Sequence, residues 1–237
     1  MINTNLTVFV VDSDVYARHS ITGYLAWDRR TRVTRQISTL AGLEDRLRQT
    51  PKAELPDSIL LDDLLIPTPD DAAQALKMIQ RYCKAHVLVL AHRPHAEIAR
   101  AIKAAGGNGY LLREEVNIRV SWLVVWAHDL PFVVTHGTKG LVSGGNVLPE
   151  PREYPELTDR IRQALMLCVV EGMSAELAAD EMGLSPHTIR TYIKEGYSIL
   201  ESHDQTEYPA KLSPQEKAFM RFTALELDNL TDKIEGE

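Results

Sequence analysis

The first half of the chain alternates between short, continuous apolar segments and longer segments in which apolar residues recur at helical spacing. Continuous apolar segments rich in valine, isoleucine and leucine are typical of strands buried on both faces of a sheet. The expected strands lie at residues 6–11, 32–37, 58–62, 86–90 and 109–112, and the expected helices at residues 15–27, 40–48, 72–83, 96–105 and 116–127. Because parallel strands require crossover connections, this order predicts an α/β domain over residues 1–128, with a five-stranded parallel, doubly wound sheet.

The segment after this domain, residues 129–155, contains an apolar patch, Phe132-Val133-Val134, followed by several glycines and prolines. Such a composition predicts a linker without a core of its own, whose first part could pack back on the sheet as a short extended segment.

The second half, residues 156–237, reads as an all-α domain built around two short helices and a tight turn. Residues 174–182 have helical spacing, and Gly183 can supply the positive φ that ends a helix. Ser185 is suited to cap the second helix, and Pro186 to begin it. Further on, Ser213-Pro214-Gln215-Glu216 has the pattern of a capping box, which predicts an additional C-terminal helix to about residue 230. We expect this helix to cover the preceding helices, with a dimer contact as the alternative.

The outer face of the second helix carries hydroxyls, a guanidinium, an ammonium and an imidazole. Such groups can contact the phosphates and base edges of a DNA major groove. The candidate DNA-binding residues are Ser185, His187, Thr188, Arg190, Thr191 and Lys194. An ordinary helical domain with polar residues outside would have the same pattern, so this alternative stays open.

Two acidic pairs lie at the ends of expected strands: Asp12 and Asp14 after the first, and Asp62 and Asp63 after the third. Functional residues collect at the carboxyl ends of parallel strands. Carboxylates there can hold Mg²⁺ and present an oxygen as a nucleophile for phosphoryl transfer. Acids at strand ends are equally suited to capping the helices that follow.

The two halves of the chain resemble the two domains found together in one protein family. VFVVDSD, ILLDDLLIP, VLVLAH and GGNGYLLR, in this order, resemble the receiver domain of response regulators, which has a flavodoxin/CheY-like fold. Leu157-Thr158, Gly172-Met173-Ser174, Glu176-Leu177-Ala178, Leu184-Ser185 and Thr188-Ile189-Arg190 resemble the LuxR-type helix-turn-helix of the NarL/FixJ/LuxR family. The sequence departs from that pattern at Ile161 and Gly196. The resemblance implies a transcription regulator of a two-component system that binds double-stranded DNA as a homodimer and has a sensor kinase or another protein as partner.

The resemblance also assigns roles to the acidic residues. The spacing to Pro67 makes Asp63 the phosphoacceptor-like residue, whereas the spacing from Pro56 favours Asp62. Metal binding would fall to Asp12 and Asp63, with Mg²⁺ as the only cofactor to consider. Where the family has two adjacent acidic residues, this sequence has Asp12 and Ser13. One metal-binding carboxylate is therefore missing, unless Asp14 supplies it.

Three further positions complete the comparison with receivers. Ala91 replaces the hydroxyl residue that contacts the phosphoryl group, Arg113 replaces the lysine, and Tyr110 fills the aromatic switch position. Guanidinium and ammonium groups are not equivalent. We therefore predict a degenerate receiver that is phosphorylated poorly or not at all, in which Arg113 pairs directly with Asp62 or Asp63.

Charge complicates the DNA-binding interpretation. The 237 residues carry a net charge of −7, and from Pro151 onward nine basic residues face seventeen acidic ones. DNA affinity depends mainly on neutralising phosphates, so an acidic domain should bind DNA weakly or only as a dimer. The alternative is an adaptor with a pseudo-receiver, whose acidic C-terminal domain binds a protein partner instead of DNA.

Other features limit the location and the chemistry. The sequence lacks a signal-peptide pattern and any apolar run of about 20 residues, so we expect a cytoplasmic protein without a membrane span. Cys83 and Cys168 read as core residues in a reducing compartment. The sequence shows neither an arrangement of nucleophile and base nor a glycine-rich loop suited to binding phosphate. We therefore do not expect an enzyme. His86, His92 and His95 are interpreted as solvated surface rather than a metal site.

Overall fold

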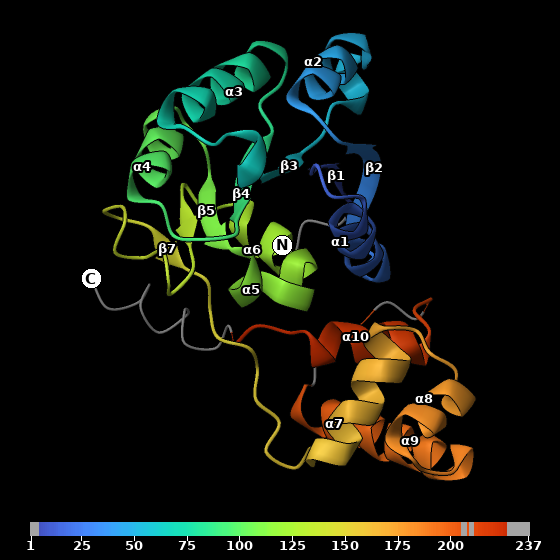
Figure 1. Ribbon diagram of the computed structural model, residues 1–237. Coiled ribbons are helices and arrows are strands. Elements are labelled where there is room, and N and C mark those ends of the chain that lie inside the picture. The colour runs from blue at the N-terminus through green and yellow to red at the C-terminus, as the bar shows by residue number, and fades with distance from the viewer. Residues whose placement is uncertain (1–4, 205–207, 209–210, 227–237) are drawn as a thin grey trace. The chain divides into compact units, whose positions relative to one another are not determined.

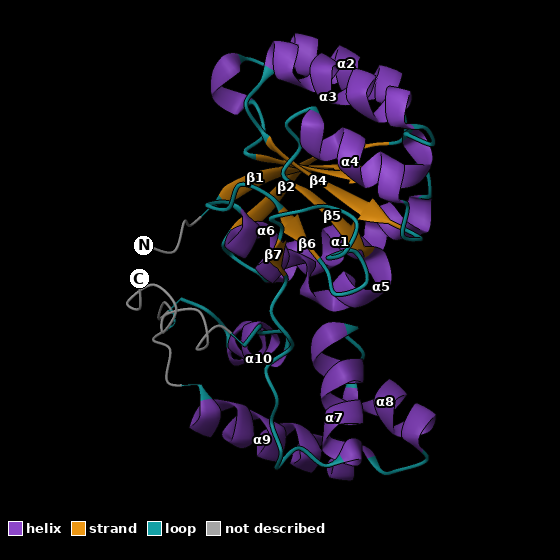
Figure 2. Ribbon diagram, turned by 90° about the vertical axis from the view of Figure 1, so that its left-hand side faces the viewer, coloured by secondary structure: helices purple, strands orange, loops and turns teal. Residues whose placement is uncertain are grey.

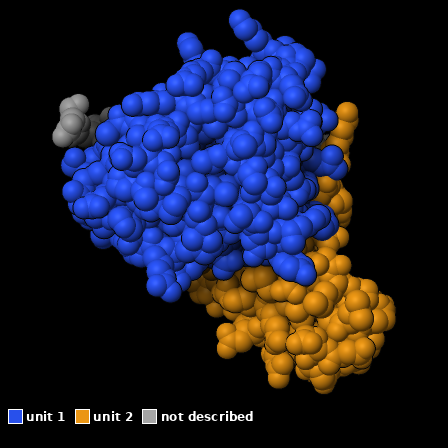
Figure 3. Space-filling view, turned by 45° about the horizontal axis from the view of Figure 1, so that its top comes forward, with its two compact units in different colours: residues 1–148 blue, residues 149–237 orange. Residues whose placement is uncertain are grey.

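The computed structural model describes residues 5–204, 208 and 211–226. The chain divides into two compact units, Met1–Leu148 and Pro149–Glu237 (Figure 3). None of the described helices combines the length and the apolar character that crossing a membrane requires.

The first unit contains a seven-stranded parallel sheet in the order β2-β1-β3-β4-β5-β6-β7 (Figure 1). The strands are β1 (Leu6–Val11), β2 (Thr31–Ile37), β3 (Ser58–Asp62), β4 (His86–Ala91), β5 (Gly109–Leu112), β6 (Val133–Val134) and β7 (Asn146–Val147). The helices are α1 (Val15–Trp27), α2 (Leu40–Gln49), α3 (Pro69–Tyr82), α4 (Ala96–Ala104), α5 (Arg113–Val116) and α6 (Val120–Ala127). In Figure 2, α2, α3 and α4 cover one face of the sheet, and α1, α5 and α6 cover the other. The predicted parallel, doubly wound α/β architecture is confirmed.

The centre of the sheet follows from the continuous apolar segments. All five residues of β3 are buried, and so are five of the six residues of β4. Strands covered by helices on both faces have no solvent-facing side, so the apolar residues do not alternate with polar ones.

The two additional strands come from the segment predicted as a linker. Val133 and Val134 are buried and pair with Gly109 and Tyr110 of β5. A Cβ atom on Gly145 would lie 2.9 Å from a methyl group of Val134, so glycine permits the close approach of β7. The linker prediction is therefore wrong for most of residues 129–148, which belong to the first unit, although the extended segment at Phe132-Val133-Val134 does pack on the sheet.

The predicted helix over residues 116–127 is interrupted. α5 ends at Val116, a 3₁₀ segment (Asn117–Arg119) follows, and α6 begins at Val120. Asn117 has φ 47°, which a continuing α-helix cannot contain. α5 begins directly after β5, so Arg113 lies at the carboxyl edge of the sheet.

The second unit is helical, as predicted. Its elements are α7 (Asp159–Leu165), a π-helical segment (Met166–Val170), α8 (Ala175–Met182), α9 (Pro186–His203) and α10 (Pro214–Phe222). Gly183 has φ 64° between α8 and α9, and the Ser185 side chain accepts a hydrogen bond from the amide of Thr188. The predicted helix-turn-helix and its cap are confirmed.

The C-terminal helix is shorter than predicted. The capping box between Ser213 and Glu216 is present, but α10 ends at Phe222. The chain then forms an antiparallel bridge between Pro151 and Leu225, and the predicted helical residues 227–230 lie outside the described residues. Gln215 Nε2 donates to the carbonyl of Cys168 at 2.9 Å, so α10 packs against the π-helical segment as we expected.

Gly196 has a structural role where the sequence departs from the NarL/FixJ/LuxR pattern. It is buried in α9, and a Cβ atom there would lie 2.9–3.0 Å from the side chain of Leu165. The glycine therefore allows α9 to pass close to α7.

Candidate functional site

The carboxyl ends of four neighbouring strands bring together five ionisable side chains of the first unit. Asp12 follows β1, Asp62 ends β3 and is followed by Asp63, His92 follows β4, and Arg113 follows β5. Asp12 and Asp62 are buried, and Asp63, Arg113 and His92 are progressively more open to solvent. We call these five residues the acidic corner.

Arg113 joins two of the acids. Its Nη2 donates to Asp12 Oδ2 at 2.7 Å and to Asp62 Oδ1 at 3.0 Å. Burial raises the pKa of Asp62 above its ordinary value, and the nearby Asp12 carboxylate raises it further, while Arg113 and His92 oppose the shift. The guanidinium thus holds together two buried carboxylates that would otherwise repel each other.

The acidic corner does not fit the magnesium site that the resemblance implies. A divalent ion shared by these carboxylates would have to lie where the Arg113 guanidinium is hydrogen bonded to both of them. Ser13 contributes a hydroxyl instead of a carboxylate, and its Oγ donates to Asp62 Oδ2 at 3.3 Å. Mg²⁺ requires nearly octahedral oxygen coordination, which this arrangement does not offer.

The structure corrects the expected position of Asp14. Its carboxylate caps α1 by accepting from the amides of Tyr16 at 2.7 Å and Ala17 at 3.3 Å. The Asp14 amide donates to Asp12 Oδ1 at 2.8 Å, so this residue fixes Asp12 through its backbone. Asp14 therefore performs the helix-capping role and does not replace the missing carboxylate.

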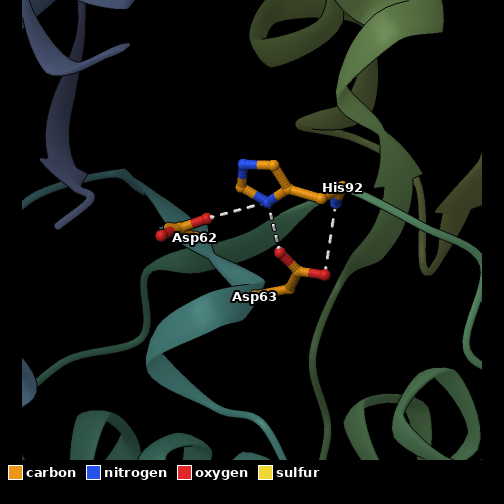
Figure 4. A group of neighbouring side chains, drawn as sticks. All are labelled: Asp62, Asp63 and His92. Atoms are coloured by element: carbon orange, nitrogen blue, oxygen red, sulfur yellow. Dashed lines mark hydrogen bonds and ion pairs between the residues drawn. The ribbon is translucent and has the colours of Figure 1, made fainter. Parts of the chain in front are cut away.

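His92 is the residue of the acidic corner that the sequence interpretation missed. Its Nδ1 lies 2.7 Å from Asp63 Oδ1 and 3.4 Å from Asp62 Oδ1 (Figure 4). Its backbone amide donates to Asp63 Oδ2 at 3.2 Å. The sequence feature that could have indicated its role is its position directly after β4, which neighbours the strand at whose end the acidic residues lie.

The other two histidines of that group lie elsewhere. His95 caps α4, with its Nδ1 accepting from the amide of Ile98 at 3.4 Å. His86, at the opposite end of β4, is partly buried with its ring centroid 4.8 Å from that of His128. Burial lowers the pKa of His86, and His128 lowers it further.

Ala91 and Tyr110 are both buried. Ala91 leaves the end of β4 without a hydroxyl group. The hydroxyl of Tyr110 donates to the carbonyl of Arg93 at 3.0 Å, which fixes the ring inside the unit. Burial raises the pKa of Tyr110 to about 12, with a further contribution from Asp63.

The second candidate site is the outer face of α9. His187, Arg190, Thr191 and Lys194 are exposed, while Ile189 is buried beneath them. The Arg190 guanidinium forms an ion pair with the exposed Glu176 of α8. Exposed pairs of this kind contribute little free energy, so Glu176 does not prevent Arg190 from contacting another group.

The hydroxyls of this face have intramolecular partners. Ser185 and Thr188 share a hydrogen bond of 2.9 Å between their side-chain oxygens, and Thr191 Oγ1 donates to the carbonyl of His187 at 3.1 Å. These contacts fix the start of α9 and leave Arg190 and Lys194 as the cationic side chains on the face.

Residues 155–200, which include α7, α8 and most of α9, match the family model described as sigma-70, region 4. No curated protein matches the chain. Three solved structures give TM-scores of 0.45–0.46. The receiver domain of NarL from Mycobacterium tuberculosis is 21% identical, with 53% of this chain and 97% of that one covered. RcsB from Salmonella enterica serovar Typhimurium, bound to promoter rprA, is 14% identical with 93% and 100% covered. ChrA, a response regulator of a heme-sensing two-component system, is 17% identical with 92% and 96% covered.

Proposed function

We propose that this chain is a DNA-binding transcriptional regulator of the response-regulator type, in which a receiver-like unit works without normal aspartyl phosphorylation. The observation that carries the proposal is the capped helix α9, which buries Ile189 and Leu200 and exposes His187, Arg190 and Lys194. The match to sigma-70 region 4 over the same helices supports this reading.

The recognition helix of a helix-turn-helix enters the major groove with its N-terminal residues against the bases. In α9 these are His187, Thr188 and Arg190, and Lys194 follows one turn later towards the phosphates. The sequence after Pro151 is acidic overall, so one copy supplies few phosphate contacts. We therefore propose a homodimer on paired half-sites, which doubles the small cationic face.

The acidic corner supports a mode of action without phosphate. Asp62 already accepts hydrogen bonds from Arg113 and Ser13, and Ala91 offers no hydroxyl to a phosphoryl group. The guanidinium supplies a fixed positive charge at the carboxylates. The first unit is thereby held in one state, and a sensor kinase is not required to reach it.

The DNA proposal predicts a specific loss of binding. The double variant Arg190→Ala/Lys194→Ala should recover few or none of the genomic DNA fragments that the wild-type chain captures, because it lacks the two cationic contacts of α9. Arg46→Ala/Arg48→Ala removes the same charge from exposed positions of α2 and should capture the wild-type set. Equal capture by both double variants would contradict the assignment of α9.

The proposed receiver without normal phosphorylation predicts that a phosphate mimic has no effect on the chain. Beryllofluoride with Mg²⁺ mimics a phosphorylated aspartate, and it should leave the oligomeric state of the chain unchanged, because Arg113 occupies the cation position. Size-exclusion chromatography with light scattering measures this. A shift to dimers on adding beryllofluoride would show that the acidic corner retains normal receiver chemistry.

The second candidate function is a protein-binding adaptor. It is favoured by the net charge of −8 after Pro151 and by the pairing of Arg190 with Glu176. An adaptor of this kind would not bind DNA even at low salt, whereas a regulator binds most tightly there.

A further inference from the structure

We infer that Asp62, Asp63 and His92 form a binding site for a divalent transition-metal ion, with zinc as the best-suited probe. The site would lie on the His92 side of Asp62, away from the Arg113 guanidinium that excludes magnesium. This inference goes beyond the proposed function and does not depend on DNA binding.

The geometry suits an ion. One donor atom from each of the three side chains lies within 4.8 Å of the others. His92 Nδ1 is 2.7 Å from Asp63 Oδ1 and 3.4 Å from Asp62 Oδ1. Ligands bound to zinc at about 2.0–2.2 Å are separated from one another by about 3 to 3.5 Å. The donor atoms of the three side chains lie towards one another (Figure 4), so small side-chain adjustments would bring all three onto one ion.

The charge of the cluster favours a cation. The carboxylates of Asp12, Asp62 and Asp63 meet here, and Arg113 is hydrogen bonded to two of them. The neighbouring Arg18 donates to the backbone carbonyls of Asp12 and Ser13 instead of to a carboxylate. The acidic corner thus carries more negative charge than Arg113 neutralises, and a divalent ion beside Asp63 would balance it.

The donor set selects the metal. An imidazole nitrogen with two carboxylate oxygens suits zinc and other first-row transition ions, whereas magnesium and calcium prefer oxygen alone. The His92 side chain is 41% exposed, so an ion can enter from solvent and keep water as a further ligand.

Surrounding hydrogen bonds already orient the ligands. Asp63 Oδ2 accepts from the backbone amide of His92 at 3.2 Å, and Asp62 Oδ2 accepts from Ser13 Oγ at 3.3 Å. Such outer contacts fix ligand direction and are a regular feature of metal sites in proteins. A bound ion would connect the loop after β3 to the loop after β4.

Titration of the full chain with zinc chloride tests the site. Isothermal titration calorimetry should show one zinc ion whose binding is lost in His92→Ala and weakened about tenfold or more in Asp63→Asn, a nearly isosteric change. His19→Ala removes an exposed histidine of α1 and should leave this ion bound. Magnesium chloride should give no comparable heat.

Cobalt supplies a second readout, because its visible absorption spectrum reports nitrogen ligation. The wild-type spectrum should change on binding, and that change should be absent in His92→Ala, whose folding is checked by circular dichroism. Zinc binding of equal strength in wild type, His92→Ala and Asp63→Asn would overturn the inference, as would the absence of zinc binding in the wild type or equal binding of magnesium. Loss of DNA capture in the α9 variant has no bearing on these outcomes, so the two proposals fail separately.

Discussion

Replacing Arg113 by alanine is expected to lower the free energy of unfolding of the first unit by about 3 kcal/mol at pH 7. Arg113 is hydrogen bonded to the buried carboxylates of Asp12 and Asp62, and its removal leaves them facing each other without a counter-charge. Breaking a buried ion pair by deleting one partner costs more than the pair itself contributes, because the remaining charges stay desolvated.

Tryptophan fluorescence during urea unfolding measures this loss selectively. All three tryptophans, Trp27, Trp122 and Trp126, belong to the first unit. Arg113→Lys keeps the positive charge and should lose much less, whereas Arg100→Ala, on the exposed side of α4, should change stability by less than about 0.5 kcal/mol. If Arg113→Ala were as stable as Arg100→Ala, the guanidinium would have no structural role in the acidic corner.

The loss of stability in Arg113→Ala should also depend on pH in a defined direction. Burial and Asp12 raise the pKa of Asp62 in the folded state. Protonation of Asp62 therefore stabilises the folded state at acid pH, and this stabilisation is lost as the pH rises through the raised pKa. Arg113 opposes this shift, and without it the pKa of Asp62 rises further. The destabilisation of Arg113→Ala should therefore be larger at pH 7 than at pH 5, and an equal loss at both would contradict this explanation.

Replacing Asp204 by alanine is expected to destabilise the second unit by about 3 to 4 kcal/mol. Asp204 is only 3% exposed and accepts a hydrogen bond from the Tyr208 hydroxyl at 2.6 Å. Its carboxylate also pairs with Arg152 Nη1 at 3.5 Å and Arg221 Nε at 3.6 Å. Without this shared carboxylate, two largely buried guanidinium groups lose their common counter-charge, and the connection between the end of α9 and α10 is weakened.

Circular dichroism at increasing urea should show the helices of the second unit unfolding earlier in Asp204→Ala, while the tryptophan transition of the first unit stays unchanged. Glu201 provides the matched control. It pairs with the same Arg221 at 3.3 Å, but its side chain is 68% exposed. Glu201→Ala should therefore change stability by less than about 1 kcal/mol. Similar losses in the two variants would show that burial of Asp204 does not determine its importance.

The strands could be predicted where burial alone determines them. The expected strands at residues 6–11, 58–62 and 109–112 coincide with β1, β3 and β5, because each is a continuous apolar segment between polar residues. β6 and β7 contain two residues each, too few to produce a pattern. They exist because Val133 and Val134 find a partner in β5 and because Gly145 lets β7 approach, and both conditions depend on the folded sheet.

Four of the five residues of the acidic corner could be predicted from the sequence, but their contacts only in part. Acids after β1 and β3 indicate a shared edge, and the predicted pairing of Arg113 with Asp62 is present. The position of Asp14 in the helix cap depends on the backbone direction after β1, which the spacing of residues does not contain. The place of His92 directly after β4 indicated this edge of the sheet, but it does not determine the direction of the side chain, so the contact of the ring with Asp63 was not predicted.

The central claim is that α9 contacts duplex DNA through its cationic face. Titration of the full chain, over a range of salt concentrations, with a genomic DNA fragment that the wild-type chain captures tests this claim most directly. The logarithm of the affinity should fall linearly with the logarithm of the salt concentration, and the slope should become shallower by about one for each phosphate contact removed in Arg190→Ala/Lys194→Ala. An absence of binding at low salt, or an identical affinity and slope in this double variant, would contradict the claim.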